Sequence, residues 1–304
     1  MITLRREGVK AMNPWFRVPL LIADALVVIT LILSGLLLGQ EKKSVFIVTD
    51  AEGVAGICRQ EQTEPSLAEL RELLTGEVNA AVEGFFDGGA TQVVVWDGHD
   101  GSQTLSAATI NPRAKLLIGW PGATMTLDRG YSAMAFIGQH SMANVRNGIM
   151  AHSFSSLGIQ NLLLNGNPIG EIGIVSALAG HFNIPVILLS GDRAAVEEIH
   201  ALMPQVETVA VKEGLGRYVC LSDSSAMARL KIQEAARRAM AGIGKIVPYK
   251  IAGPITLQIE HTTRNSLTPD TSALPGVQVL DDRTLRIEGK DFFEAWTRCK
   301  VYRQ

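Results

Sequence analysis

Along most of the chain, short apolar runs alternate with longer segments in which apolar residues recur every three or four positions. The short runs have the length of buried strands, and the longer segments have the periodicity of helices. The predicted strands are 45–48, 92–96, 133–137, 161–164, 184–189 and 207–211. The predicted helices are 66–86, 171–181, 194–203 and 224–241. This alternation predicts an α/β domain over residues 44–243, a layered and mostly parallel sheet with helices on both faces.

The last part of the chain has a different pattern. ITLQIE at 255–260 alternates apolar and polar residues with the period of a half-buried strand. The apolar runs VQVL and TLRI flank the polar segment Asp281-Asp282-Arg283, which predicts a hairpin. We therefore expect a smaller, β-rich C-terminal subdomain of α+β type over residues 244–304.

An apolar segment near the N-terminus has the length of a membrane span. Residues 18–39 read VPLLIADALVVITLILSGLLLG, with Asp24 as the only charge, and about 20 apolar residues cross a bilayer. Four basic residues precede it: Arg5, Arg6, Lys10 and Arg17. They predict a cytoplasmic N-terminus and an anchored chain whose remaining residues lie outside the cytoplasm. Residues 1–43 are then a transmembrane helix with its linker. The alternatives are a cleaved signal peptide, which would export the protein, and a buried soluble helix.

Composition and charge exclude some classes of function. The 304 residues carry a formal net charge of −2, which argues against nucleic-acid binding, since that needs a basic surface. Three cysteines without C-x-x-C spacing allow at most one intrachain disulfide and imply no cysteine zinc site. The chain has no G-x-S-x-G motif, so a serine hydrolase lacks support.

Acids and imidazoles cluster where predicted strands end. In open α/β sheets, ligands bind at the carboxyl ends of the strands. Asp50 and Glu52 follow the first predicted strand, and His99 lies in the glycine-flanked loop after the second. His140 ends the third strand, and Glu171 begins a helix shortly after the fourth. If these strands are neighbours, the side chains converge.

Such crowded carboxylates resist ionising together unless positive charge compensates them. Two divalent cations would neutralise them, and carboxylate oxygen with imidazole nitrogen are usual ligands of hydrolytic zinc. Asp50 is the predicted bridge between the two ions. We expect His99 and His140 to complete one metal, and Glu52 and Glu171 the other.

His152 lies in the polar loop MAHS, twelve residues after His140. This position predicts a general acid–base or an oxyanion-stabilising residue. The other histidines have simpler interpretations. His181 closes a helix, where a cation favours the negative end of the dipole, and His200 and His261 are expected at the surface.

Seven segments, in order, resemble the DppA-type bacterial D-aminopeptidases. They are TDAEGVAG (49–56), TGEVNAAVEG (75–84), VVVWDGHDGS (93–102), FIGQHS (136–141), GIMAHSF (148–154), NGNPIGEIGI (165–174) and PVILLSGDRAA (185–195). The resemblance runs from about residue 44 to the C-terminus and is looser in the tail. The segment 1–39 has no counterpart in the family pattern.

The resemblance implies a dinuclear zinc aminopeptidase, with two Zn²⁺ per subunit, that removes D-amino acids such as D-alanine from short peptides. The family's metal positions fall on the same five residues that the strand-end argument selects: Asp50, Glu52, His99, His140 and Glu171. Its catalytic histidine falls on His152. The resemblance also implies a homo-oligomer, in the form of a ring with an internal chamber. In a ring of two back-to-back layers, uncleaved anchors would point in opposite directions.

Two other functions remain open at the level of the sequence. One is a metal-dependent amidase that acts on other cell-wall-derived substrates, which an external location would suit. The other is a non-catalytic, membrane-tethered peptide-binding module that keeps a metal for stability. Retention of all the ligand types together with His152 argues against the second of these.

Overall fold

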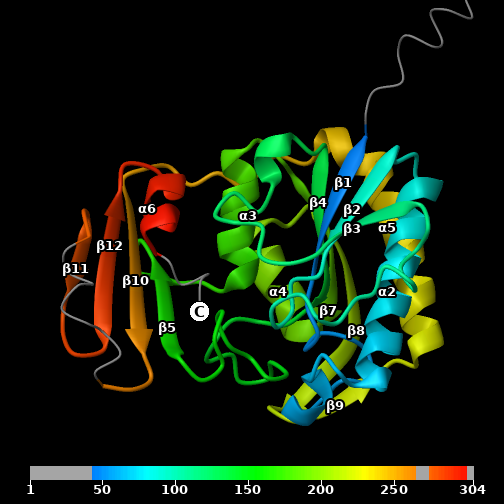
Figure 1. The fold of residues 1–304 in the computed structure, drawn as a ribbon, viewed down its shortest axis with the longest axis horizontal. Coiled ribbons are helices and arrows are strands. Elements are labelled where there is room, and N and C mark those ends of the chain that lie inside the picture. Colours follow the sequence, from blue (N-terminus) through cyan, green and yellow to red (C-terminus); the bar gives the residue numbers. More distant parts are fainter. Residues whose placement is uncertain (1–42, 265–273, 300–304) are drawn as a thin grey trace, which may run out of the picture. The chain divides into compact units, whose positions relative to one another are not determined.

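The computed structural model describes residues 43–264 and 274–299, which contain a seven-stranded sheet. Its strands are Ser44–Thr49 (β1), Gln92–Trp96 (β2), Ala114–Leu117 (β3), Ala133–Gln139 (β4), Val186–Asp192 (β7), Glu207–Gly216 (β8) and Val219–Ser222 (β9). They lie in the order β3-β2-β1-β4-β7-β8-β9 (Figure 1). Every neighbouring pair is parallel except β8 with β9. The mostly parallel sheet that the sequence predicts is therefore confirmed.

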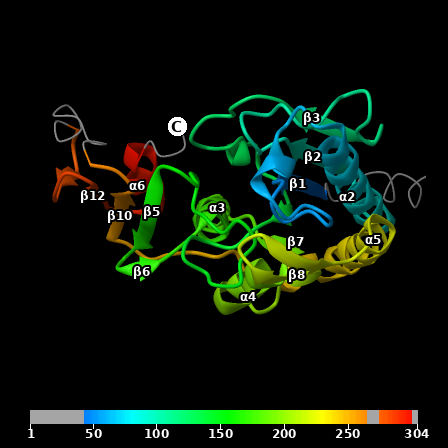
Figure 2. The same ribbon diagram turned by 90° about the horizontal axis from the view of Figure 1, so that it is seen from below.

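Helices cover both faces of this sheet (Figure 2). The helices Ala68–Asp87 (α2) and Ser225–Gly242 (α5) pack on one face, and Glu171–His181 (α3) and Arg193–Leu202 (α4) on the other. Alternate residues of β1 serve the two faces. Val45 and Ile47 pack with α2 and α5, whereas Phe46 and Val48 pack in the cluster that contains α3. A strand buried on both sides has no polar positions, which explains its continuous apolar sequence.

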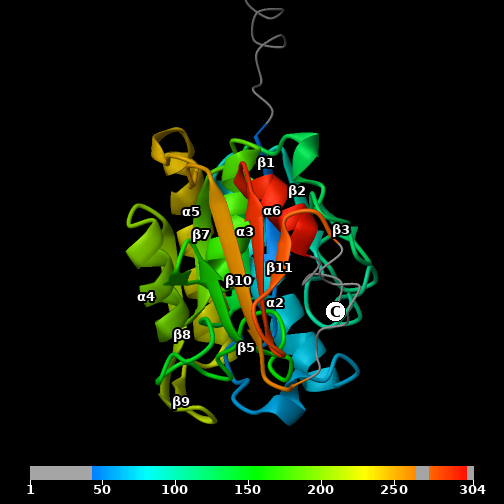
Figure 3. The ribbon, with the colours of Figure 1, turned by 90° about the vertical axis from the view of Figure 1, so that its left-hand side faces the viewer.

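A second, five-stranded sheet is antiparallel and lies beside α3 (Figures 2 and 3). Its strands are Val277–Val279 (β11), Thr284–Gly289 (β12), Ile255–His261 (β10), Ile159–Leu164 (β5) and Asn167–Pro168 (β6), in the order β11-β12-β10-β5-β6. The helix Phe292–Cys299 (α6) packs against β10 and β12. The pairing of β11 with β12 confirms the predicted hairpin. Short 3-10 helices complete the fold at Gln60–Thr63 (η2), Leu127–Arg129 (η3) and Ile243–Lys245 (η4).

The strand β5 corrects one prediction from the sequence. We expected it in the parallel sheet of the first domain, but it pairs with β10 of the C-terminal part and with β6. Leu162 and Leu164 face the core, while Leu163 between them is only half-buried. An apolar residue on the partly exposed face hides the period of two, so the run resembles a strand of a parallel sheet. Through this pairing the second sheet joins the two predicted domains.

The predicted membrane anchor, at residues 18–39, lies outside the described residues. Within residues 43–264 and 274–299, no helix is long and apolar enough to cross a membrane. The anchor and the location outside the cytoplasm therefore stay predictions from the sequence. Fractionation of cells that express the full chain would contradict them if the protein appeared only in the cytoplasmic soluble fraction.

Candidate metal centre

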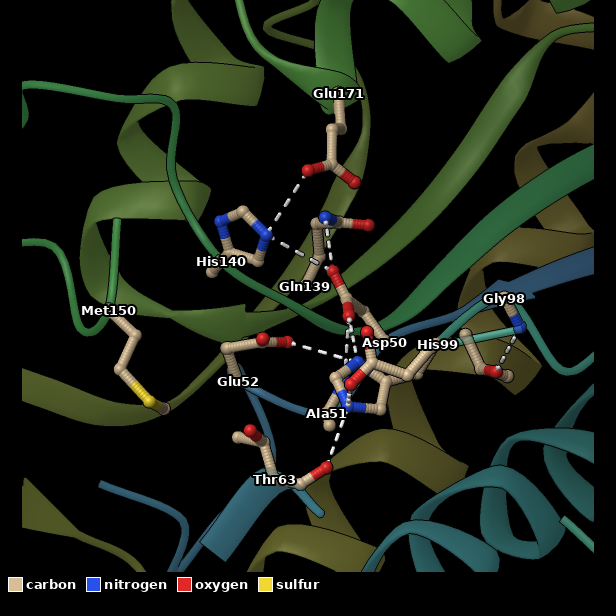
Figure 4. A network of polar contacts seen from close by, with 12 residues as sticks. Asp50, Ala51, Glu52, Thr63, Gly98, His99, Gln139, His140, Met150 and Glu171 are labelled. Atoms are coloured by element: carbon tan, nitrogen blue, oxygen red, sulfur yellow. Dashed lines mark hydrogen bonds and ion pairs between the residues drawn. The ribbon is translucent and has the colours of Figure 1, made fainter. Parts of the chain in front are cut away.

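The six predicted site residues come together beyond the carboxyl ends of three adjacent strands. Figure 4 shows five of them, and the sixth, His152, stacks on His140. The order β2-β1-β4 places the loops after these strands side by side. The first residue of α3 supplies the remaining carboxylate. Four of the six residues are only 2–8% exposed: Asp50, Glu52, His99 and His140. The other two, His152 and Glu171, are half-buried.

Asp50 lies between two imidazoles. Its Oδ1 is 3.2 Å from Nδ1 of His99, and its Oδ2 is 3.3 Å from Nε2 of His140. The amide of Gln139 donates to Oδ2 at 2.9 Å, and the backbone N–H of Ala51 donates to Oδ1 at 2.9 Å. These donors orient the carboxylate so that one oxygen faces each histidine. This is the arrangement expected of a carboxylate shared by two ions.

Each of the three histidines donates one ring N–H to a main-chain carbonyl. His99 Nε2 donates to Thr63 at 2.8 Å, His140 Nδ1 to Ser141 at 2.8 Å, and His152 Nδ1 to Met150 at 2.9 Å. A carbonyl oxygen only accepts, so the ring hydrogen is placed on these nitrogens. The opposite nitrogen of a neutral ring then has its lone pair directed at the carboxylates. Metal-binding histidines are oriented by outer hydrogen bonds of this kind.

The two glutamates lie on opposite sides of Asp50. Glu52 Oε2 is 3.5 Å from Nδ1 of His99. Glu171 Oε1 is 3.4 Å from Nε2 of His140 and accepts the backbone N–H of Phe154 at 2.7 Å. Among the described residues, Glu52 Oε2 and His140 Nε2 are buried and make no hydrogen bond. Buried polar atoms rarely lack partners, and here both are directed at a site rich in lone pairs.

This donor set fits divalent metal ions. Two groups each bring three ligand atoms within 4.8 Å of one another: Asp50 with Glu52 and His140, and His140 with His152 and Glu171. His99 lies close to Glu52, and His140 lies close to Glu171. From the sequence we expected instead that the two histidines bind one metal and the two glutamates the other. The oxygen and nitrogen donors suit zinc.

The pKa shifts in the centre also indicate a site for cations. Burial, reinforced by Glu52, raises the pKa of Asp50 to about 7. Burial would lower the pKa of His99, but the carboxylates of Glu52 and Asp50 outweigh it and raise that pKa to about 10. The pKa of His140 is raised in the same way by Asp50 and Glu171. Without metal, the carboxylates hold protons on these rings, and metal ions would take the place of that positive charge.

His152 differs from the other two histidines. Burial and the neighbouring His140 lower the pKa of His152, so its ring is neutral near pH 7. The rings of His140 and His152 stack with centroids 4.0 Å apart. Its Nε2 is 3.8 Å from Oε1 of Glu171, longer than the 3.4 Å from Nε2 of His140 to the same oxygen. A neutral imidazole with its free nitrogen at the edge of the centre is able to accept or donate a proton.

A bulge in β4 directs two consecutive residues into the centre. The pairing of β4 with β7 shifts register between Ile137 and Gln139. Gly138 in between has a φ of 79°, and a Cβ there would lie 2.2 Å from the carbonyl oxygen of Asp50. Only glycine tolerates both the positive φ and this approach. The bulge lets Gln139 and His140 both reach Asp50, which regular alternation would prevent.

Two supporting residues hold the loops. Asp97 accepts the backbone N–H groups of Thr104 and Leu105 through Oδ2, each at 2.9 Å, and so closes the loop that carries His99. Lys212 on β8 is 3% exposed, and its Nζ donates to carbonyls in the loop that carries Glu52. We did not predict either role. The available signal for Lys212 was a single lysine within the apolar run VAVK.

A cavity of about 480 Å³ adjoins the centre. Asp50, Gln139 and Glu171 form its polar end. The rest of its wall is mainly apolar and includes the aromatic residues Trp96, Trp120, Phe136, Phe154 and Trp296. A concave, largely apolar space with a few convergent polar groups is typical of a substrate site.

Known proteins resemble this chain over nearly all of the described region. The model of a family described as D-aminopeptidase matches residues 44–301. A D-aminopeptidase of Bacillus subtilis is 27% identical over 263 residues, which cover 84% of this chain and 95% of that protein. A solved structure, the Zn-dependent D-aminopeptidase DppA from Bacillus subtilis, is described as a self-compartmentalizing protease. It matches with a TM-score of 0.79 and 26% identity, covering 86% of this chain and 96% of that one.

Proposed function

The chain belongs to the D-aminopeptidase family, and from that premise we propose that it is a zinc enzyme that removes N-terminal D-amino acids from short peptides at a dinuclear site. D-alanine is the proposed residue removed. The observation that supports this most directly is the convergence of three carboxylates and three imidazoles whose lone pairs face one another.

The distances suggest how the two ions are held. Asp50 would be the carboxylate shared by the two ions, since its two oxygens face different histidines. His99 and Glu52 would hold one ion, and His140 and Glu171 the other. When bound, the zinc pair polarises the scissile carbonyl and lowers the pKa of a water molecule.

The chain's own residues position the peptide and move its protons. The acidic end of the 480 Å³ cavity attracts the substrate's free amino group, and the apolar wall excludes water from the reacting bond. His152 holds its N–H against Met150, so Nε2 has the lone pair. It takes a proton from the attacking water and returns it to the leaving amine as the C–N bond breaks.

A substrate panel tests this function. We expect zinc-loaded protein to hydrolyse D-Ala-D-Ala, and to act at least about 10-fold more slowly on L-Ala-L-Ala, because the two differ in transition-state fit. A chelator should abolish turnover, and added zinc should restore it. Cleavage of N-acetyl-D-Ala-D-Ala would contradict the aminopeptidase assignment and favour an amidase. Peptide binding without any turnover would indicate a binding module.

The variant His152→Ala separates a catalytic role from a metal-binding one. We expect it to retain the zinc content of the unmodified protein and to lose about 10²-fold or more in kcat, because a positioned acid–base is missing. His200→Ala is the matched control, since His200 is exposed and its ring forms a hydrogen bond with Thr208, far from the centre in sequence. Loss of zinc from His152→Ala would instead make His152 a ligand together with His140 and Glu171.

Assembly into a homo-oligomer, in the form of a ring, is part of the same proposal. It is supported by the likeness to a protein described as self-compartmentalizing. Sedimentation velocity of the purified chain checks it, and a monomer at micromolar concentration would contradict it.

A further inference from the structure

A second pocket, of about 360 Å³, has His152 in its wall. The loop between His140 and His152 forms much of it. Its charged side chains are Arg146 and Arg217, and no carboxylate lines it. Neutral polar residues complete the lining, among them Asn144, Ser156, Gln160 and Thr262.

The two pockets have opposite charge. The charged residues that line the aromatic cavity are all acidic: Asp50, Asp100 and Glu171. Those of the second pocket are basic. A short peptide in solution has the same polarity, with a cationic amino group at one end and a carboxylate at the other.

His152 connects the basic pocket with the acidic cavity. It lines the basic pocket, and its Nε2 is 3.8 Å from Oε1 of Glu171, which lines the cavity. The proton that His152 returns goes to the nitrogen of the leaving group. The leaving part of the substrate is therefore in contact with a residue that lines the basic pocket.

Arg217 is held at that place by its neighbours. Its Nη1 donates to the carbonyl of Ala151 at 3.2 Å, next to His152, and its Nε donates to the hydroxyl of Tyr218 at 3.1 Å. Among the described residues, neither Arg217 nor Arg146 forms an ion pair with a carboxylate. Guanidinium groups bind carboxylates through paired, charge-assisted hydrogen bonds, so a substrate carboxylate would supply the missing partner.

We propose that Arg146 and Arg217 bind the C-terminal carboxylate of the substrate, which makes short peptides with a free carboxyl terminus the preferred substrates. This inference rests on the proposed function. Each residue adds about 3.3–3.6 Å to an extended chain, so the carboxylate of a long peptide lies far beyond the pocket. The preference of the enzyme for short peptides and its preference for a free C-terminal carboxylate thus have the same cause.

The test compares D-Ala-D-Ala with its C-terminal amide, a pair that differs only in the carboxylate. We expect the unmodified enzyme to favour the acid at least about 10-fold in kcat/KM, mainly through KM. The double variant Arg146→Gln/Arg217→Gln should lose this preference while its kcat/KM for the amide and its zinc content stay within about 2-fold. Arg237→Gln is the control, since Arg237 is an exposed arginine on α5 paired with Glu234.

Calorimetry gives a readout that does not depend on turnover. Zinc-loaded His152→Ala should bind the acid more tightly than the amide, and the added Arg146→Gln/Arg217→Gln changes should remove the difference. Equal binding and equal cleavage of acid and amide by the parent proteins would overturn the inference, as would a double variant that keeps the preference. Failure of the proposed function shows separately, as absence of turnover on both peptides.

Discussion

Asp50→Asn is expected to lose its bound zinc and at least about 10³-fold in kcat/KM on D-Ala-D-Ala, since the chemistry depends on the metal ions. The carboxylate faces His99 with one oxygen and His140 with the other, at 3.2 and 3.3 Å. Asparagine keeps the shape but offers one neutral oxygen and an amide group that only donates. Metal content by atomic spectroscopy and steady-state kinetics measure the two effects.

Asp100→Asn is the matched control for this variant. Asp100 is in the same loop as His99, but its carboxylate is 65% exposed and faces Nε2, the nitrogen bonded to Thr63. We expect its zinc content to stay within about 3-fold of that of the unmodified protein, as for changes of exposed side chains. Because Asp100 lines the substrate cavity, zinc content and not kcat/KM is the control measurement. Full zinc content in Asp50→Asn would contradict the bridging role, and zinc loss in both variants would assign the metal to the outer side of His99.

Lys212→Met is expected to destabilise the protein by at least about 3 kcal/mol and to lower its zinc content. The buried ammonium donates to the carbonyls of Glu52, Val54 and Ile57, the second at 2.8 Å. Methionine fills the same space but removes the ammonium donor from all three carbonyls, of which only that of Val54 keeps another donor among the described residues, the N–H of Ile57 at 3.2 Å. Because one of these carbonyls belongs to Glu52 itself, the loop that positions this carboxylate loses its support. Urea unfolding and metal analysis measure both consequences.

Lys231→Met distinguishes this effect from the loss of any lysine. Lys231 forms a 2.6 Å ion pair with Asp223, and its side chain is 45% exposed. Exposed pairs of this type contribute about 1 kcal/mol or less. If Lys212→Met proved as stable as Lys231→Met, the supporting role of Lys212 would be wrong.

Local patterns predicted the strands and helices that surround the centre. β1, β2 and β4 were found because strands buried on both faces contain continuous apolar runs, here Val45–Val48, Val93–Trp96 and Ala133–Ile137. The helix α2 was predicted within two residues of its observed start, Ala68. The edge strands β3 and β9 were missed, since each is short and largely half-buried or exposed and so has no clear apolar run. β5 was assigned to the wrong sheet because Leu163 masks its alternation.

For the site, the chemical type of each donor and its position at a strand end were readable in the sequence. Which of these donors lie next to one another was not. It depends on the strand order β2-β1-β4, which puts the loop of His99 on one side of Asp50 and that of His140 on the other. The contacts of Lys212 with the loop of Glu52 join residues 160 positions apart, and no local pattern reports them.

The sequence by itself determined the parallel layered sheet, the donor set of the centre and the presence of a histidine suited to proton transfer. These follow from hydrophobic periodicity and from side-chain chemistry, which act within short segments. Only the tertiary structure decided which donor atoms lie next to one another, which lysine holds the loop, and that two arginines line the pocket that contains His152. These features depend on contacts between segments that are distant in the sequence. The strand order and the bulge at Gly138 determine which segments meet, and no pattern among neighbouring residues reports them.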